Sequence, residues 1–332
     1  MAKPRVYIHR LLWCPYDRYM DEENEEALAS FAEVINDGNR PDPLPPEELA
    51  DRLTGVSGIL SLNGSCAGEI TREVLRKAGT VEVASISHYW DQYHEIVPGW
   101  EEEGVEVLDA SDPCSEAVAE WALGAMIAGL RRFDEYDRRM KSGESWPDYR
   151  AAGQLNGSTV GLVGVGRVGR IIAEYLEAFD VQVLAHDPYM PEDEAEDLEI
   201  ELTDLDTVLR ESDVVSLHAR VTPETRGMIG ARELALIRDG ALFVNCARAA
   251  LVDGKAFRTE LAKKRFRAYL DVFEPEPPPA DDVLRKLDSV VMTPHVAGTT
   301  PLMFLRCGRA AIEALGEFFA VQDAFGVPRG KG

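Results

Sequence analysis

One continuous segment constrains the fold of this chain more than any other: residues 159–189, which read TVGLVGVGRVGRIIAEYLEAFDVQVLAHDPY. An apolar, β-branched run leads into three glycines, an amphipathic helical pattern follows, and a second apolar run ends before an aspartate. Changes of apolar periodicity of this kind are typical of a strand, a helix and a second strand. Strands joined through a helix usually pair in parallel, so the segment predicts part of a parallel α/β sheet.

The glycine spacing in this segment also predicts a ligand. Gly164, Gly166 and Gly169 form GxGxxG between the strand and the helix. The first permits a tight turn, the second lets the backbone approach a pyrophosphate, and the third allows the helix to pack on the strand. Asp187 stands about 20 residues downstream, where a carboxylate binds both ribose hydroxyls and repels a 2′-phosphate. The segment favours NAD over NADP; the alternative is a simple tight turn with Asp187 capping a loop.

Short β-branched runs and helical patterns alternate through almost the whole chain. We predict strands at residues 6–9, 58–62, 81–86, 105–108, 159–163, 181–185, 214–218, 242–245, 268–271 and 290–293. Helices are predicted at residues 21–35 and 71–77, and a long one starts at Ser115. A single domain rarely exceeds about 250–300 residues, so a chain of 332 residues predicts two α/β domains.

Three later stretches place polar residues at the expected carboxyl ends of strands, where open parallel sheets bind ligands: VNCARAALVDG, LDVFEPEPPP and VVMTPHVAG. Arg248 can bind a carboxylate through two hydrogen bonds, and His295 can give a proton to the alkoxide that hydride transfer leaves. Glu274 or Glu276 can keep that histidine protonated. Each residue alone could be an ordinary loop residue, but together they predict chemistry on a small carboxylate beside a nicotinamide.

Composition excludes several other classes of protein. The chain has 35 Lys+Arg against 59 Asp+Glu, and the net charge of -24 would repel nucleic acids and anionic membranes. We therefore expect small molecules or a second copy of the chain as partners. Its 27 arginines and eight lysines fit either a salt-adapted host or a GC-rich genome. The five cysteines form no CxxC, so no metal site is predicted. No signal peptide or membrane span is visible, which predicts a cytoplasmic protein.

Taken in order, these motifs resemble the D-isomer-specific 2-hydroxyacid dehydrogenases. The resemblance covers nearly the whole chain and is dense over residues 115–298, which contain SEAVAE, GLVGVGRVGR, HDPY, VSLH, TPETRGMIG, VNCARAALVD, LDVFEPEP and TPHVAG. It implies two Rossmann-like, doubly wound domains. A cofactor domain at residues 113–301 would be inserted into a flavodoxin-like substrate domain made of residues 1–112 and 302–332. A helix over residues 300–321 would return to the substrate domain, and a homodimer would form through the cofactor domain.

The resemblance also implies roles for single residues. Arg248 would bind the substrate carboxylate and carbonyl, and His295 would be the general acid/base. Glu276 would be its carboxylate partner, because it directly precedes the proline that closes the motif. Substrate would also meet Asn63, Gly64 and Ser65. NAD would contact the three glycines and Asp187, and in addition Arg167, Val168, Cys246, Ala247, Asp271 and Gly298.

The implied activity is the NAD-dependent interconversion of a 2-keto acid and a D-2-hydroxy acid. One alternative is an NAD-sensing, co-repressor-like binding protein of the same fold. Another is a formate or phosphite dehydrogenase; the formate enzymes pair their histidine with a glutamine, which Glu276 disfavours. The aromatic segment at residues 85–100, SISHYWDQYHEIVPGW, departs most from the family and is a candidate for a substrate pocket or a domain edge.

Overall fold

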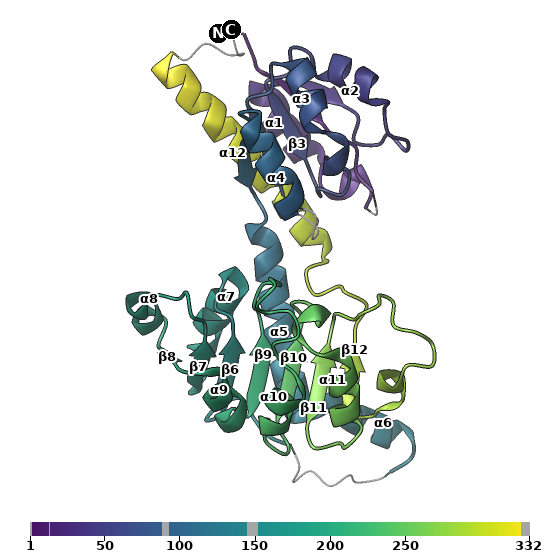
Figure 1. Ribbon diagram of the computed structural model, residues 1–332, viewed down its shortest axis with the longest axis vertical. Helices are drawn as coiled ribbons and strands as arrows, with labels where there is room; N and C mark the ends of the chain where they lie inside the picture. The colour runs from purple at the N-terminus through teal and green to yellow at the C-terminus, as the bar shows by residue number, and fades with distance from the viewer. Residues whose placement is uncertain (1, 13, 88–92, 145–151, 327–332) are drawn as a thin grey trace. The chain divides into compact units, whose positions relative to one another are not determined.

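The computed structural model describes residues 2–12, 14–87, 93–144 and 152–326. The chain divides into two compact units: Met1–Cys114 with Thr299–Gly332, called unit 1, and Ser115–Gly298, called unit 2. Unit 2 is therefore inserted into the sequence of unit 1. Each unit contains one parallel β-sheet with helices against it (Figure 1).

The sheet of unit 1 has five parallel strands in the order β2-β1-β3-β4-β5. The order reverses between β1 and β3, which is the flavodoxin-like arrangement. The strands are β1 (Arg5–Ile8), β2 (Glu33–Asn36), β3 (Gly58–Ser61), β4 (Val83–Ile86) and β5 (Glu106–Asp109). Its helices include α1 (Glu22–Phe31), α2 (Pro46–Leu53), α3 (Arg72–Ala78), α4 (Tyr93–Glu102) and α12 (Pro301–Phe325).

The sheet of unit 2 has seven strands in the order β12-β11-β10-β9-β6-β7-β8. The order reverses between β6 and β9, as in the Rossmann fold, with one further strand at the β12 edge. The strands are β6 (Thr159–Val163), β7 (Gln182–His186), β8 (Ile200–Leu202), β9 (Val214–Leu217), β10 (Leu242–Asn245), β11 (Arg267–Leu270) and β12 (Val290–Met292). The helices are α5 (Asp112–Arg131), α6 (Phe133–Lys141), α7 (Arg167–Leu176), α8 (Glu192–Asp197), α9 (Leu205–Glu211), α10 (Ala231–Leu236) and α11 (Gly254–Leu261).

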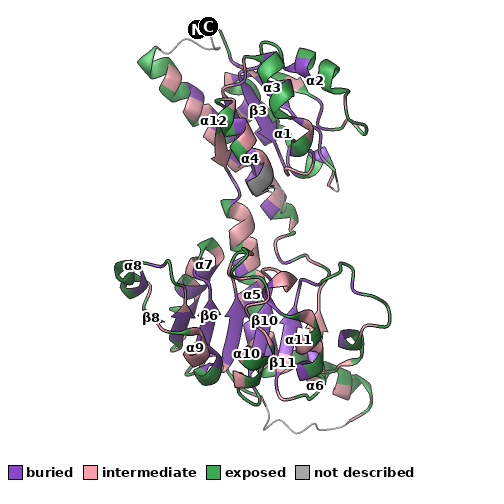
Figure 2. Cartoon of the chain, viewed as in Figure 1, coloured by how far each residue is buried: buried purple, intermediate pink, exposed green. Residues whose placement is uncertain are grey.

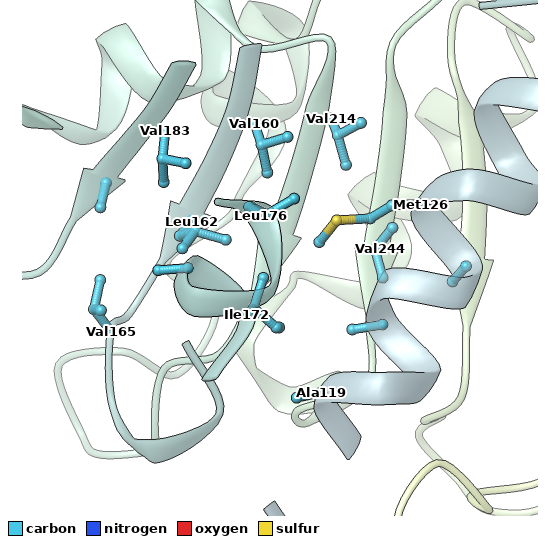
Figure 3. Packing of buried hydrophobic residues seen from close by; sticks show 14 of the residues in the cluster. Ala119, Met126, Val160, Leu162, Val165, Ile172, Leu176, Val183, Val214 and Val244 are labelled. Atoms are coloured by element: carbon cyan, nitrogen blue, oxygen red, sulfur yellow. The ribbon is translucent and has the colours of Figure 1, made fainter. Parts of the chain in front are cut away.

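One apolar core of unit 2 joins the central strands to α5 and α7. Met126 of α5 and Ile172 and Leu176 of α7 belong to the same cluster as Val160 and Val244 of the sheet (Figure 3). All five side chains are 0% exposed. Helices that cover a parallel sheet bury its strands, so such strands are continuous apolar runs. Figure 2 shows the central strands β3, β6 and β10 as buried.

The prediction of two doubly wound α/β domains is confirmed, and the strands at residues 159–163 and 242–245 have the predicted bounds. The helix predicted at residues 21–35 is wrong in its last part. It ends at Phe31, because Ala32 is extended and the next residues pair with β1 as the edge strand β2. Sequence analysis also missed α2 and the short strand β8.

The long helix predicted to start at Ser115 in fact starts at Asp112. Pro113 lies in its first turn, where a missing N–H costs no hydrogen bond, so the proline does not delay the start. The predicted helix over residues 300–321 is α12; Thr300 caps it by accepting a hydrogen bond from the Met303 N–H at 3.0 Å. Within the described residues, no helix combines the length and the apolar character needed to cross a bilayer.

Candidate active site

The glycine turn after β6 has the geometry that its sequence predicts. Gly164 has a φ of +89°, and a Cβ there would lie 2.5 Å from the Ala219 backbone nitrogen. A Cβ on Gly169 would lie 2.8 Å from the Gly164 carbonyl oxygen. A Cβ on Gly166 would meet no atom within 4 Å, and this residue is the N-cap of α7. The turn is therefore closed on the protein side and open at the helix N-terminus, where a pyrophosphate would bind.

Asp187 follows β7, the strand that pairs with β6. Its Oδ2 accepts a hydrogen bond from the Val165 N–H at 2.7 Å, and its Oδ1 accepts one from the Tyr189 N–H at 2.9 Å. Each carboxylate oxygen can accept a further bond. The carboxylate is thus fixed beside the glycine turn, in the position that a ribose-binding acid requires.

The loop after β9 faces the glycine turn, and sequence analysis did not assign it to the site. The His218 N–H donates to the Val163 carbonyl at 2.8 Å, and Ala219 is the residue that closes on Gly164. Burial lowers the pKa of His218 to about 3, so its ring is neutral. The sequence signal for this loop was VSLH, which stands at the end of a predicted strand. Strands β6 and β9 flank the reversal of strand order, where ligands bind in sheets of this kind.

Arg248 follows β10 and is held by a turn that Asn245 organises. The Asn245 side chain, in a residue 2% exposed, donates to the Arg248 carbonyl and accepts from the Ala247 N–H, both at 3.1 Å. Arg248 donates from Nη1 to the Ala247 carbonyl at 2.8 Å. Within this turn, burial raises the pKa of the Cys246 thiol to about 12, which leaves it uncharged. The sequence did not predict Asn245 as the residue that holds the backbone of the turn that carries Arg248.

His295 and Glu276 are in direct contact. The Nδ1 atom of His295 lies 2.7 Å from Glu276 Oε2, and the other carboxylate oxygen of Glu276 accepts from the Phe273 N–H at 2.7 Å. His295 has a φ of +55°, a left-handed conformation that is uncommon for a residue with a side chain. The structure thus pairs the histidine with Glu276, the second glutamate of EPEPPP.

Asp271 holds the turn that carries His295. Its carboxylate accepts hydrogen bonds from the Thr293 hydroxyl, from the Val296 N–H at 2.9 Å and from the Ala297 N–H at 2.8 Å. Its backbone carbonyl accepts from the His295 N–H at 2.9 Å. Asp271 is 0% exposed, so these bonds keep a buried carboxylate satisfied and fix the left-handed backbone of His295.

The strand order brings these groups to one edge of the unit 2 sheet. Strands β10, β11 and β12 are adjacent and parallel, and Arg248, Asp271 and His295 follow them in turn. Arg167 and Val168 open α7 beside the glycine turn, and Gly298 ends unit 2.

The predicted substrate residues Asn63, Gly64 and Ser65 lie in unit 1, after β3. There Asn63 Oδ1 accepts from the Ser65 N–H at 3.1 Å, and Asn63 Nδ2 donates to the Leu12 carbonyl at 2.7 Å. In the aromatic segment, residues 88–92 lie outside the described residues, so His88, Tyr89 and Trp90 are not placed.

Comparison with known proteins agrees with this site. Residues 123–297 match the family model of the D-isomer-specific 2-hydroxyacid dehydrogenase NAD-binding domain. A glyoxylate reductase from Thermofilum pendens is 34% identical over 90% of this chain and 87% of its own length. A D-3-phosphoglycerate dehydrogenase from Methanocaldococcus jannaschii is 34% identical over 84% of this chain, which spans only 53% of that relative. The crystal structure of a phosphoglycerate oxidoreductase from Rhizobium etli has a TM-score of 0.79 at 25% identity, covering 99% of this chain and 98% of that one.

The family match spans the glycine turn, Asp187, Arg248, Glu276 and His295. It confirms NAD as the predicted cofactor, and the match to the Thermofilum reductase extends over both units. The chain belongs to the D-isomer-specific 2-hydroxyacid dehydrogenase family.

Proposed function

We propose that this protein is an NAD-dependent oxidoreductase that interconverts a small 2-keto acid and the corresponding D-2-hydroxy acid. The observation that carries the proposal is the contact of 2.7 Å between His295 Nδ1 and Glu276 Oε2. This pair lies at the same sheet edge as Arg248 and the glycine turn. A proton donor, an arginine and a dinucleotide site at one edge are what reduction of a keto acid requires.

In this proposal His295 moves the proton. Glu276 holds Nδ1 and stabilises the imidazolium, and Nε2 gives its proton to the substrate oxygen during reduction. In the reverse direction the neutral ring takes the hydroxyl proton. The backbone turn fixed by Asp271 keeps the ring in place through the cycle.

Arg248 binds the substrate in the proposed reaction. Its planar guanidinium offers two parallel N–H groups to the carboxylate and stabilises the charge that develops on the carbonyl oxygen. Asn63, Gly64 and Ser65 contribute further substrate contacts. The named relatives act on glyoxylate and on phosphoglycerate, which supports a small 2-keto acid as substrate class.

NAD would bind along the glycine turn. Gly166, Arg167 and Val168 would contact the pyrophosphate at the N-terminus of α7, and Asp187 would accept the ribose hydroxyls. Further contacts would come from Cys246, Ala247 and Gly298, with Asp271 at the carboxamide. When bound, the reduced cofactor supplies a hydride to C2 of the keto acid.

We also propose that the protein is cytoplasmic and that it forms a homodimer through unit 2. Two apolar side chains of α6, Phe133 and Met140, are 57% and 52% exposed and offer apolar surface next to α5. Light scattering on the purified protein would give the mass; a monomer at micromolar concentration would contradict the dimer.

The proposal is tested by assaying glyoxylate, hydroxypyruvate, pyruvate, phenylpyruvate and branched-chain 2-keto acids with NADH and NADPH. We expect one small keto acid to be reduced with NADH. His295→Ala should abolish turnover and leave NADH binding within about threefold of wild type, because the ring acts on the substrate. Normal turnover in that variant would remove the proposed role. NADH binding without reduction of any keto acid would favour an NAD-sensing binding protein.

A further inference from the structure

Arg170 connects the glycine turn to helix α8. It lies in the first turn of α7, and its Nη1 donates to the carbonyl of Val165 at 2.8 Å. Its Nη2 donates to Oε2 of Glu194 in α8. We call this arrangement the Arg170–Glu194 bridge. No motif of the glycine fingerprint requires a cation at this position, so the nucleotide site as described so far does not account for it.

The residue that the bridge holds is central to the turn. Val165 stands between Gly164 and Gly166, and its side chain is 1% exposed. Its N–H donates to Asp187 Oδ2 at 2.7 Å, while its carbonyl accepts from Arg170. The two polar groups of one residue are therefore fixed from two sides: by the carboxylate expected at the ribose, and by the bridge.

Holding the Val165 peptide in one orientation affects how well this turn can bind a ligand. The two glycines on either side of Val165 have wide conformational freedom, and the pyrophosphate contacts proposed for this turn use backbone N–H groups. A turn that is ordered before the ligand arrives does not have to be ordered by binding, which raises affinity. An arginine suits this task because its fork reaches two acceptors in fixed directions, whereas a lysine offers one point charge.

We propose that Arg170 and Glu194 are positioning residues for NAD: the bridge holds the Val165 peptide so that the turn and Asp187 keep the geometry that accepts the dinucleotide. This inference rests on the proposed function, because it needs NAD at the glycine turn. The competing explanation is an ordinary surface ion pair. The Arg170 and Glu194 side chains are 39% and 48% exposed, and pairs as exposed as this contribute little to stability by themselves.

The chain provides a matched control for that explanation. Arg309 and Glu313 of α12 form an exposed ion pair with an N–O distance of 2.8 Å, and their side chains are 38% and 59% exposed. This pair lies in unit 1 and is far in sequence from the glycine turn. Arg309→Gln removes the same charge at the same exposure, without touching the turn.

The experiment measures the NADH dissociation constant by fluorescence titration for wild type, Arg170→Gln, Arg170→Lys, Glu194→Gln and Arg309→Gln, together with the midpoint of thermal unfolding. Losing a charge-assisted bond to Val165 should raise the dissociation constant about tenfold in Arg170→Gln. Arg170→Lys and Glu194→Gln should raise it about threefold, because each keeps one part of the bridge. Arg309→Gln should remain within about twofold of wild type.

Steady-state kinetics separates positioning from a general structural effect. At saturating NADH, the variants of the bridge should keep the wild-type kcat and the wild-type KM for the keto acid, since only the cofactor step is weakened. An NADH dissociation constant within twofold of wild type in both Arg170→Gln and Glu194→Gln overturns the proposal. An equal rise in Arg309→Gln does the same. If the wild type itself binds no NADH, the proposed function fails. If the wild type binds NADH and the bridge variants bind it equally well, only the proposed role of the bridge fails.

Discussion

At the reversal of strand order in unit 2, between β6 and β9, a Cβ added to Gly166 would meet no atom within 4 Å. At the corresponding point of unit 1, between β1 and β3, the loops that follow these two strands are joined by hydrogen bonds of their side chains. Arg10 donates to the Glu69 carboxylate and to the Pro41 carbonyl at 3.0 Å, and Asn63 donates to the Leu12 carbonyl at 2.7 Å. The two sheets offer the same kind of position, but the turn in unit 2 is open at Gly166, whereas the loops in unit 1 are joined by side-chain hydrogen bonds.

The residues directly after the first strand of each unit cause this difference. After β6 the chain reads GVGRVG, and after β1 it reads HRLL. Glycines leave room for a ligand and expose N–H groups, whereas a buried arginine and histidine need partners and take them from the neighbouring loop. A doubly wound sheet provides the position for a ligand, and the side chains at the turn decide whether a dinucleotide can use it.

The largest effect is expected from closing the turn of unit 2. In Gly164→Ala the new Cβ would lie 2.5 Å from the Ala219 nitrogen, at a φ of +89° that alanine rarely adopts. We expect the NADH dissociation constant to rise about 100-fold, measured by fluorescence titration. Gly124→Ala in α5, where the Cβ meets nothing within 4 Å, is the control and should bind NADH normally. Unchanged binding in Gly164→Ala would show that the turn does not need a glycine.

The second prediction concerns the hydrogen-bonded loops of unit 1. Arg10 is 7% exposed, so Arg10→Met leaves the Glu69 carboxylate without its main partner. We expect unit 1 to lose about 2–3 kcal/mol of stability in urea unfolding, with the NADH dissociation constant unchanged. Arg72→Met removes an arginine that is 50% exposed and should cost less than about 1 kcal/mol. A changed NADH dissociation constant in Arg10→Met would contradict the prediction that this loop of unit 1 does not affect NADH binding.

The third prediction compares two buried asparagines, one in each unit. Asn245 holds the Arg248 turn, and Asn24 donates to the Tyr19 carbonyl at 2.8 Å and the Leu305 carbonyl at 3.0 Å. Replacing either by alanine should cost about 1–3 kcal/mol of stability. Only Asn245→Ala should also lower kcat/KM, by about tenfold, because the backbone turn that carries Arg248 loses its support. Equal losses of kcat/KM in both variants would assign Asn245 to folding alone.

The smallest effect is a pH dependence of unit 1. Burial alone would raise the pKa of Asp37, but Arg52, Arg40 and the Tyr7 hydroxyl outweigh it and lower the pKa below the ordinary value of 3.8. The stabilisation is therefore present above that ordinary value and is lost as the pH falls through the lowered one. Asp37→Asn should cost about 1 kcal/mol at pH 7 and less at pH 3, measured as thermal midpoints. The same difference at both pH values would contradict the shift.

Sequence reasoning worked best where an apolar run is buried on both faces. The strands at residues 159–163 and 242–245 have such runs, bounded by glycine or polar residues. It failed at β2, whose EVIN directly follows a helix and reads as its last turn. Edge strands have one partner and a mixed pattern, so tertiary pairing decides their conformation. The residue types of the site could be predicted, whereas the supporting bonds of Asn245 and Asp271 could not.

By itself, the sequence determined the glycine turn, the residue that follows each strand and the apolar runs that form the two sheets, because these depend on local spacing and on burial. Only the tertiary structure decided how Asp271 holds a left-handed histidine, and that Arg170 joins the glycine turn to α8. These are hydrogen bonds between segments far apart in the chain. Their geometry exists only after the strand order has brought the segments together. No local sequence pattern therefore predicts these bonds.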